Sequence, residues 1–110
     1  MSQFAISALC YAIAEGNGSV WSGHFVQRLM TRTQPDHTDV QYVVCDDEPE
    51  VIEEYPDTGR GRSCLIWGTV RGRVAHVVCS YPPNPVVITA YWPDPREWTD
   101  NFRRRKGGTS

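Results

Sequence analysis

The sequence lacks the short motifs that mark the common catalytic and metal-binding sites. It holds no phosphate-binding glycine loop, no nucleophile elbow and no zinc signature. No two of its cysteines form a Cys-x-x-Cys pair, and its acidic residues do not follow the spacing of a calcium-binding loop. We therefore expect neither a metal nor another cofactor.

Long apolar runs are also missing. No stretch approaches the ~20 residues of a membrane-spanning helix, and the N-terminus has no basic region followed by an apolar core, so no signal peptide is indicated. These features predict a cytoplasmic protein with no membrane contact. In a reducing cytosol, the four cysteines (Cys10, Cys45, Cys64 and Cys79) are expected to be free and buried, the alternatives being a disulfide or a metal role.

The chain has 110 residues, enough for one domain with a real core. Its net charge of −2 argues against a general nucleic-acid binder, which usually has a basic domain. The charge is uneven, however. Residues 1–95 hold six Lys or Arg and eleven Asp or Glu, whereas residues 96–110 hold five and two. We predict a single domain over 1–110, with a core at about 3–102 and a basic, flexible tail at 103–110.

Hydrophobic periodicity predicts an α+β fold. Apolar positions recur with helical spacing in the first half, and alternate with polar ones in the second. Helices are expected at about 3–15, 24–32 and 37–46. Strands are expected at 50–55, 63–71, 73–80 and 86–92. The short connections favour a four-stranded antiparallel sheet, covered on one face by the N-terminal helices. Asp94-Pro95 is expected to open a short C-terminal helix that carries Trp98 and Phe102.

The segment from Ser22 to Arg32 carries the first candidate site. Ser22 is a suitable helix N-cap, and the i, i+4, i+8 spacing places His24, Arg28 and Arg32 on one helix face. Guanidiniums can hold a phosphate or carboxylate with paired donors, and an imidazole can move a proton near neutral pH. The alternative is a solvated helix face whose arginines pair with nearby acidic residues.

The strands carry the second candidate site. Alternation puts His76 on one sheet face with Val74 and Val78, and a polar ring in a compact sheet needs either a partner or a cleft. The structural alternative is a core histidine bonded to Tyr55 or Thr89 on a neighbouring strand. Thr89 and Tyr91 share one face. The Tyr91 hydroxyl could donate to a phosphoryl oxygen, or the ring could simply cover the core.

The remaining charges are interpreted more simply. The acidic run from Asp46 to Asp57 contains no Lys or Arg, and is expected to be a solvated edge that guards the first strand against pairing. Arginines on the hairpin loops, Arg62 among them, could form a basic rim around a substrate or an acidic partner, together with Arg103 to Lys106 of the tail. Arg32 and Arg62 are the candidate anion-binding residues. A charged terminus, by contrast, is often only solubilising.

An ordered set of short segments resembles a bacterial family of unknown function, the DUF4258 domain family. The set comprises Ser22-Gly23-His24, Arg28-Leu29-Met30, Arg32, Asp39-Val40, Ile52-Glu53-Glu54-Tyr55-Pro56, Ser63-Cys64-Leu65, Gly68, His76-Val77-Val78, Val87-Ile88-Thr89-Ala90-Tyr91, Pro93 and Trp98. The resemblance runs from about residue 3 to 106. It departs at Leu29, because the family usually has Arg followed directly by Met.

The resemblance implies a distant similarity to the small RNase toxins of the RelE and BrnT kind, which cut RNA without a metal. By that analogy the candidate catalytic residues are His24, Arg28, His76 and Tyr91. Either histidine would take the 2′-hydroxyl proton, Arg28 with Arg32 would stabilise the phosphorane, and Tyr91 would assist the leaving group. RNA and an antitoxin-like protein are the implied partners. The alternative is a non-enzymatic module that binds a protein or a small anionic ligand.

Overall fold

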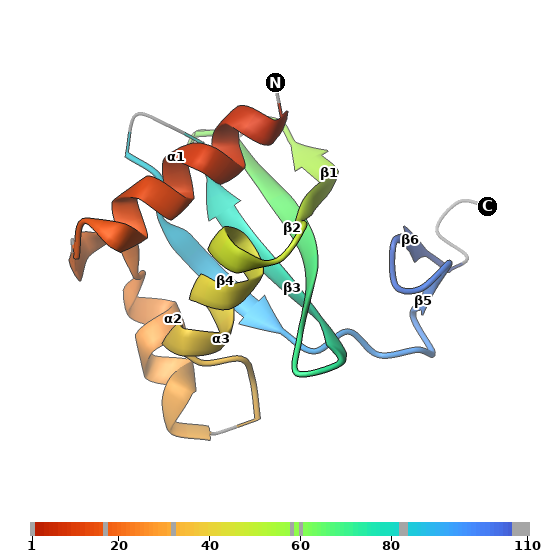
Figure 1. Cartoon of the computed structure of the whole chain (residues 1–110). Coiled ribbons are helices and arrows are strands. Elements are labelled where there is room, and N and C mark those ends of the chain that lie inside the picture. The colour runs from red at the N-terminus through yellow and green to blue at the C-terminus, as the bar shows by residue number, and fades with distance from the viewer. Residues whose placement is uncertain are drawn as a thin grey trace.

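The fold consists of a helical layer on one face of a four-stranded sheet, followed by a small C-terminal hairpin (Figure 1). The computed structural model describes residues 2–16, 18–31, 33–57, 59, 61–81 and 84–106, without the side chains of residues 2–5. The α-helices are α1 (Ser2–Ala14), α2 (Gly23–Arg28) and α3 (His37–Gln41). The other helical segments are η1 (Gly18–Val20), η2 (Leu29–Thr31) and the π-helix η3 (Tyr42–Asp46). The strands are β1 (Glu50–Tyr55), β2 (Ser63–Val70), β3 (Arg73–Ser80), β4 (Val87–Tyr91), β5 (Trp98–Thr99) and β6 (Arg104–Arg105).

The main sheet has the order β1-β2-β3-β4 with every neighbouring pair antiparallel, which confirms the predicted α+β class. The β2–β3 connection is the tight turn Arg71-Gly72, in which both residues have positive φ. No described helix is long and apolar enough to cross a membrane.

Local signals explain where the helices begin. The Ser22 Oγ accepts a hydrogen bond from the Phe25 N–H at 3.0 Å, as expected of an N-cap. The same Oγ donates to the Ile88 carbonyl at 2.9 Å, which ties the start of α2 to β4. Asp36 and Asp39 form a reciprocal capping box at the start of α3.

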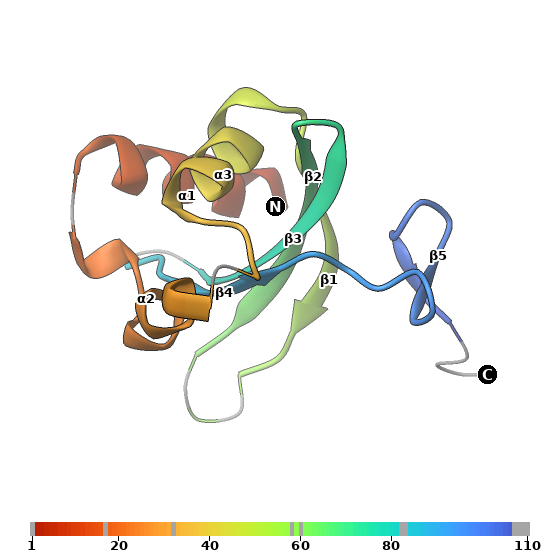
Figure 2. The ribbon, with the colours of Figure 1, turned by 90° about the horizontal axis from the view of Figure 1, so that it is seen from below.

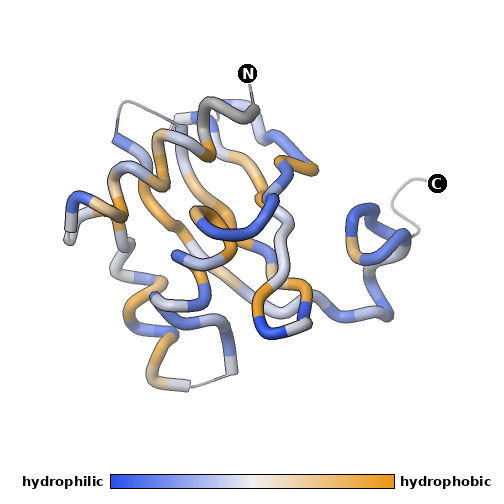
Figure 3. Tube along the Cα trace, in the orientation of Figure 1, coloured by the Kyte–Doolittle hydropathy of each residue, from blue (hydrophilic) through white to orange (hydrophobic). Residues whose placement is uncertain are grey.

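The core lies between the helices and one face of the sheet. Its fully buried side chains include Leu9, Phe25, Val40, Ile66 and Val77, and apolar residues mark the middle strands in Figure 3. Gly68 of β2 is needed here, because a Cβ at this position would lie 2.6 Å from Val43 Cγ1. The π-helix therefore packs almost onto the backbone of the sheet.

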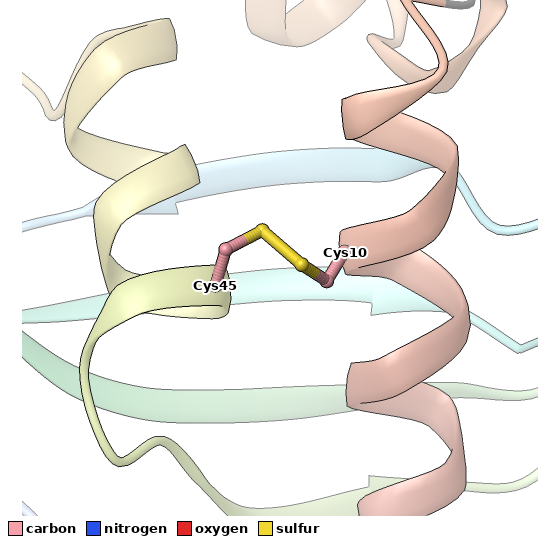
Figure 4. Close-up of a disulfide and its surroundings, with 2 residues drawn as sticks. All are labelled: Cys10 and Cys45. Carbon is pink, nitrogen blue, oxygen red and sulfur yellow. A yellow bond between two sulfur atoms is a disulfide. The ribbon is translucent and has the colours of Figure 1, made fainter.

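The prediction of four free cysteines is wrong for one pair. Cys10 of α1 and Cys45 of η3 form a disulfide, with their Cα atoms 5.3 Å apart (Figure 4). Separated by 35 residues, they were not an obvious pair in the sequence, but packing of α1 beside η3 brings them together. Cys64 and Cys79 are free and buried, as predicted.

The predicted C-terminal helix is also wrong. After a turn at Asp94, the chain forms the β5–β6 hairpin, in which Trp98 pairs with Arg105. Asp100, Asn101 and Phe102 all have positive φ, which a right-handed helix does not allow. Long-range contacts of Trp98 with the sheet outweigh the local helical pattern. Arg103 to Lys106, expected in a flexible tail, are part of this hairpin, and residues 107–110 lie outside the described residues.

Candidate functional site on the sheet face beneath the hairpin

The sheet face turned away from the helices carries polar and aromatic side chains in cross-strand rows, and we call it the hairpin face. Its first row is Glu50, Trp67, His76 and Tyr91. Its second is Glu53, Leu65, Val78 and Thr89. Its third is Tyr55, Ser63 and Ser80. Figure 2 shows the helices on one side of the sheet and the C-terminal hairpin away from them. The hairpin face is therefore the side that β5 and β6 cover.

His76 is fully buried at the centre of this face. Its Nε2 lies 2.8 Å from the Phe102 carbonyl oxygen, its Nδ1 lies 3.2 Å from the Tyr91 hydroxyl, and its ring meets Trp98 edge-on at 4.5 Å. A carbonyl oxygen only accepts, so Nε2 carries the proton and Nδ1 accepts the hydrogen bond that the Tyr91 hydroxyl donates.

The surroundings keep this pair neutral. Burial lowers the pKa of His76, even though the hydrogen bond to Phe102 opposes the shift. Burial likewise raises the pKa of Tyr91. The partners suggested from the sequence, Tyr55 and Thr89, are wrong, because Tyr91 and the hairpin backbone take their place. His76 therefore orients the Tyr91 hydroxyl and leaves it protonated near neutral pH.

Next to this pair, Glu53 forms the centre of a second cluster. Arg105 donates from Nε and from a terminal nitrogen to its two carboxylate oxygens, at 2.9 and 3.0 Å, and the Tyr55 hydroxyl donates at 2.6 Å. Burial alone would raise the pKa of Glu53, but these hydrogen bonds outweigh it and hold the pKa below its usual value. Burial and the bond to Glu53 raise the pKa of Tyr55 to about 12. Glu53 is thus an ionised carboxylate with two donors in place.

A matching contact holds the other end of the hairpin. Arg103 donates to Glu50 at 2.9 Å, and its guanidinium lies 3.8 Å from the centre of the Trp67 ring. The Trp67 indole N–H donates to the Asn101 carbonyl at 2.8 Å. Glu50 and Glu53 therefore do not form the purely solvated edge expected from the sequence, because each is paired with an arginine of the hairpin.

A hollow of about 290 Å³ adjoins this cluster along the third row. Tyr55, Ser63 and Ser80 line it from the sheet, and Arg62 lines it from the β1–β2 loop. Arg62 pairs with Glu54 at 3.2 Å and lies over the Tyr81 ring. Because Tyr55 belongs to both the hollow and the Glu53 cluster, a ligand in the hollow would lie beside the ionised carboxylate.

The structure brings together some of the residues predicted from the sequence and not others. His76 and Tyr91 are hydrogen-bonded partners, and Arg62 lines the hollow beside the third row. His24 and Arg28 are exposed on α2, in the helical layer. Neither of them makes a hydrogen bond, ion pair or ring contact with His76 or Tyr91. Arg32 lies outside the described residues.

Sequence reasoning missed Glu53 and Arg105 as site residues. The register shifts between Val51 and Glu53, so Glu50 and Glu53 lie on the same face despite an odd spacing of three. Simple alternation could not reveal this. The basic run at 103–106 was visible in the sequence, but its fold onto the sheet depends on Trp98 reaching His76.

An ionised carboxylate, a guanidinium, a buried histidine–tyrosine pair and an adjoining hollow form a set suited to acid–base chemistry on an anionic substrate. Among the residues whose positions are described, no three His, Cys, Asp or Glu side chains gather where they could hold a metal ion. The arrangement thus defines a small α+β domain with a candidate acid–base site on the sheet face opposite its helices.

Comparison with known protein families shows which family the chain belongs to. Residues 21–92 match the family described as a domain of unknown function, DUF4258, and the chain belongs to that family. The match covers α2 to β4 and therefore includes Glu53, His76 and Tyr91, whereas α1 and the C-terminal hairpin lie outside it. No curated protein and no solved structure matches the chain.

Proposed function

We propose that the chain is a metal-independent ribonuclease, distantly similar to toxins of the RelE and BrnT kind, with its site on the hairpin face. One observation carries the proposal: the Glu53 carboxylate, bonded to Arg105 and Tyr55, lies on the same face as the His76–Tyr91 pair. RNA supplies its own nucleophile, the 2′-hydroxyl, so cleavage needs only a base, an acid and a cation for the phosphorane.

Each step has a candidate residue. Glu53 takes the proton of the 2′-hydroxyl as the O2′–P bond forms, because its lowered pKa keeps it ionised. Arg105 stabilises the charge on the pentacoordinate phosphorane. Tyr91, whose hydroxyl is held by His76 before the reaction, turns its O–H away from Nδ1 and donates the proton to the departing 5′-oxygen as the P–O5′ bond breaks. The products are a 2′,3′-cyclic phosphate and a 5′-hydroxyl end.

The test is cleavage of single-stranded RNA in the presence of a chelator, with the matching 2′-deoxy strand as the uncleavable control. Glu53→Gln and Tyr91→Phe should each lower the rate by about 10²-fold or more. Glu48→Gln removes an exposed carboxylate outside this face and should cleave as the wild type does. The proposal fails if wild type and Glu50→Gln, whose hairpin has lost one ion pair, both leave RNA intact, or if the two site variants cleave normally.

The same assay tests the prediction from the sequence that His24 and Arg28 of α2 are catalytic. His24→Ala and Arg28→Ala should lower cleavage if α2 contacts the substrate, and should leave it unchanged if the reaction is confined to the hairpin face. Coexpression with a neighbouring reading frame tests the proposed antitoxin-like partner. The cytoplasmic location also stays a proposal, and the Cys10–Cys45 disulfide weighs against it.

A different hollow favours the second candidate function, binding of a small anionic ligand. It measures about 530 Å³ and lies where α2, α3 and the β2–β3 turn meet. Arg71 and Arg73 line it together with Asp36 and Asp39. Arg71 pairs with Asp39 at 2.7 Å, whereas the Arg73 guanidinium lies 4.3 Å from the centre of the Trp92 ring and is the arginine that a ligand would meet. Calorimetric titration with inorganic phosphate and nucleoside monophosphates tests this function. Arg73→Gln should abolish binding, and Arg62→Gln, which lies outside this hollow, should preserve it.

A further inference from the structure

The C-terminal hairpin closes the candidate site. The atoms that seal His76 belong to residues 98–102, since Trp98 covers the ring and the Phe102 carbonyl takes Nε2. Arg105 likewise occupies both oxygens of Glu53. A substrate therefore cannot reach these groups while the hairpin lies on the sheet.

Two ion pairs hold the hairpin down, in addition to the Trp98 ring and the two hydrogen bonds to the Asn101 and Phe102 carbonyls. Arg103 pairs with Glu50 and Arg105 with Glu53, and the paired side chains are all partly exposed. Exposed ion pairs are weak and are screened by salt. The hairpin is also largely hydrophilic in Figure 3, and Trp98 is the buried hydrophobic side chain that it contributes among the described residues.

Backbone strain favours the same release. Asp100, Asn101 and Phe102 adopt three consecutive left-handed conformations, with φ of 54°, 57° and 67°. Such conformations cost free energy for residues other than glycine. The bonds of Trp67 and His76 to the Asn101 and Phe102 carbonyls hold this turn in place, and the strain is relieved once they break.

The charge of the hairpin indicates what would compete for it. Between residues 96 and 106 there are five basic and two acidic residues, and Arg104 and Lys106 are exposed beside the two paired arginines. Guanidiniums bind phosphate with the same paired donors that they use for carboxylate. A nucleic-acid backbone presents many phosphates to such a segment at once.

We propose that the C-terminal hairpin is a removable cover, which a nucleic-acid backbone releases by replacing the carboxylates of Glu50 and Glu53 with phosphates as partners of Arg103 and Arg105. The inference rests on the proposed function, since the cover regulates the same site. Release would free Glu53 to act as a base while Arg105 holds a phosphate. The cover lies outside the family-matched residues 21–92.

Chemical access to His76 tests the cover without any RNA cleavage. Diethyl pyrocarbonate modifies accessible imidazoles, and mass spectrometry reads each site separately. His24 and His37 are exposed and serve as internal references, whereas His76 is sealed. In the wild type, His76 should react far more slowly than the other two. A single-stranded DNA oligonucleotide, which lacks the 2′-hydroxyl, should accelerate the reaction at His76 but not at His24 or His37.

Two variants distinguish release of the cover from a general destabilisation of the fold. Glu50→Gln removes one exposed ion pair and should raise the His76 rate about two- to fivefold without DNA, whereas Glu48→Gln should leave it unchanged. Sodium chloride at the ionic strength of the oligonucleotide should have a smaller effect than the oligonucleotide itself. Circular dichroism and a cooperative thermal transition like that of the wild type show that each variant is folded.

The outcomes distinguish the two proposals. If neither the oligonucleotide nor Glu50→Gln changes the His76 rate, or if salt alone matches the oligonucleotide, the cover proposal is overturned. If His76 responds as expected but no RNA is cut, the proposed ribonuclease function fails and the cover stands as a nucleic-acid-responsive element.

Discussion

Loss of the Cys10–Cys45 disulfide is expected to destabilise the fold strongly. The bridge closes a loop with a sequence separation of 35 residues. In the chain-entropy description, a loop of this length restricts the unfolded state by about 4 kcal/mol at 25 °C. For a domain of this size, that corresponds to a drop in Tm on the order of 15 °C. The bridge is also the covalent link between α1 and the segment that packs on Gly68.

The assay compares urea or thermal unfolding of the oxidised chain, the chain with a reducing agent, and the double variant Cys10→Ser with Cys45→Ser. The double variant is the matched control, because Cys64 and Cys79 are free thiols and reductant should not alter its stability. Without a reductant, the unfolded protein should have two thiols that react with an alkylating agent, those of Cys64 and Cys79. Four reactive thiols would show that the disulfide is absent and would refute the reasoning. So would oxidised and reduced chains whose unfolding free energies agree within about 0.5 kcal/mol.

Three further perturbations follow from the packing and the charges. Gly68→Ala should cost about 1–3 kcal/mol of unfolding free energy, because its Cβ would meet Val43, whereas Gly23→Ala has open space and should cost far less in the same denaturation assay. The pKa of His76 is lowered in the folded state, so its stabilising contribution is complete above its ordinary pKa of 6.5 and is lost as pH falls from there toward the folded-state value. Unfolding free energy measured against pH should show this loss in the wild type, and His76→Gln should remove it. Asp39→Ala should cost about 1–2 kcal/mol in chemical denaturation, because the partly buried N–H of Asp36 loses its acceptor in the capping box, and a cost below about 0.5 kcal/mol would contradict that account.

Elements that depend on local pattern were predictable from the sequence. The alternation of β3 placed His76 and Val78 on one face, and the capping role of Ser22 located the start of α2. These features follow from neighbours within a few residues. The fold class could be inferred for the same reason, since the periodic segments before Pro93 formed the helices and strands that their patterns predict.

Features that depend on distant contacts were not predictable. Residues around Trp98 have a helical pattern, but the stacking of Trp98 on His76 draws them into a hairpin. The shift between Val51 and Glu53 is invisible to simple alternation, and it decides which carboxylates face Arg103 and Arg105. The pairing of Cys10 with Cys45 likewise needs the relative position of two helices. Half of the candidate site therefore emerged only from the three-dimensional arrangement.

The disulfide has a consequence for the integrity of the molecule. Glu15, Gly16, Gly18 and Ser19, in the connection between α1 and α2, are exposed and lie within reach of proteases. A nick there would leave two polypeptides that still migrate as one species until a reductant is added. Ile6 and Leu9 would remain in the core, so the nicked molecule keeps its hydrophobic centre. Helix α1, which lies outside the family-matched residues 21–92, thus stays covalently attached to them even after the backbone between the two is cut.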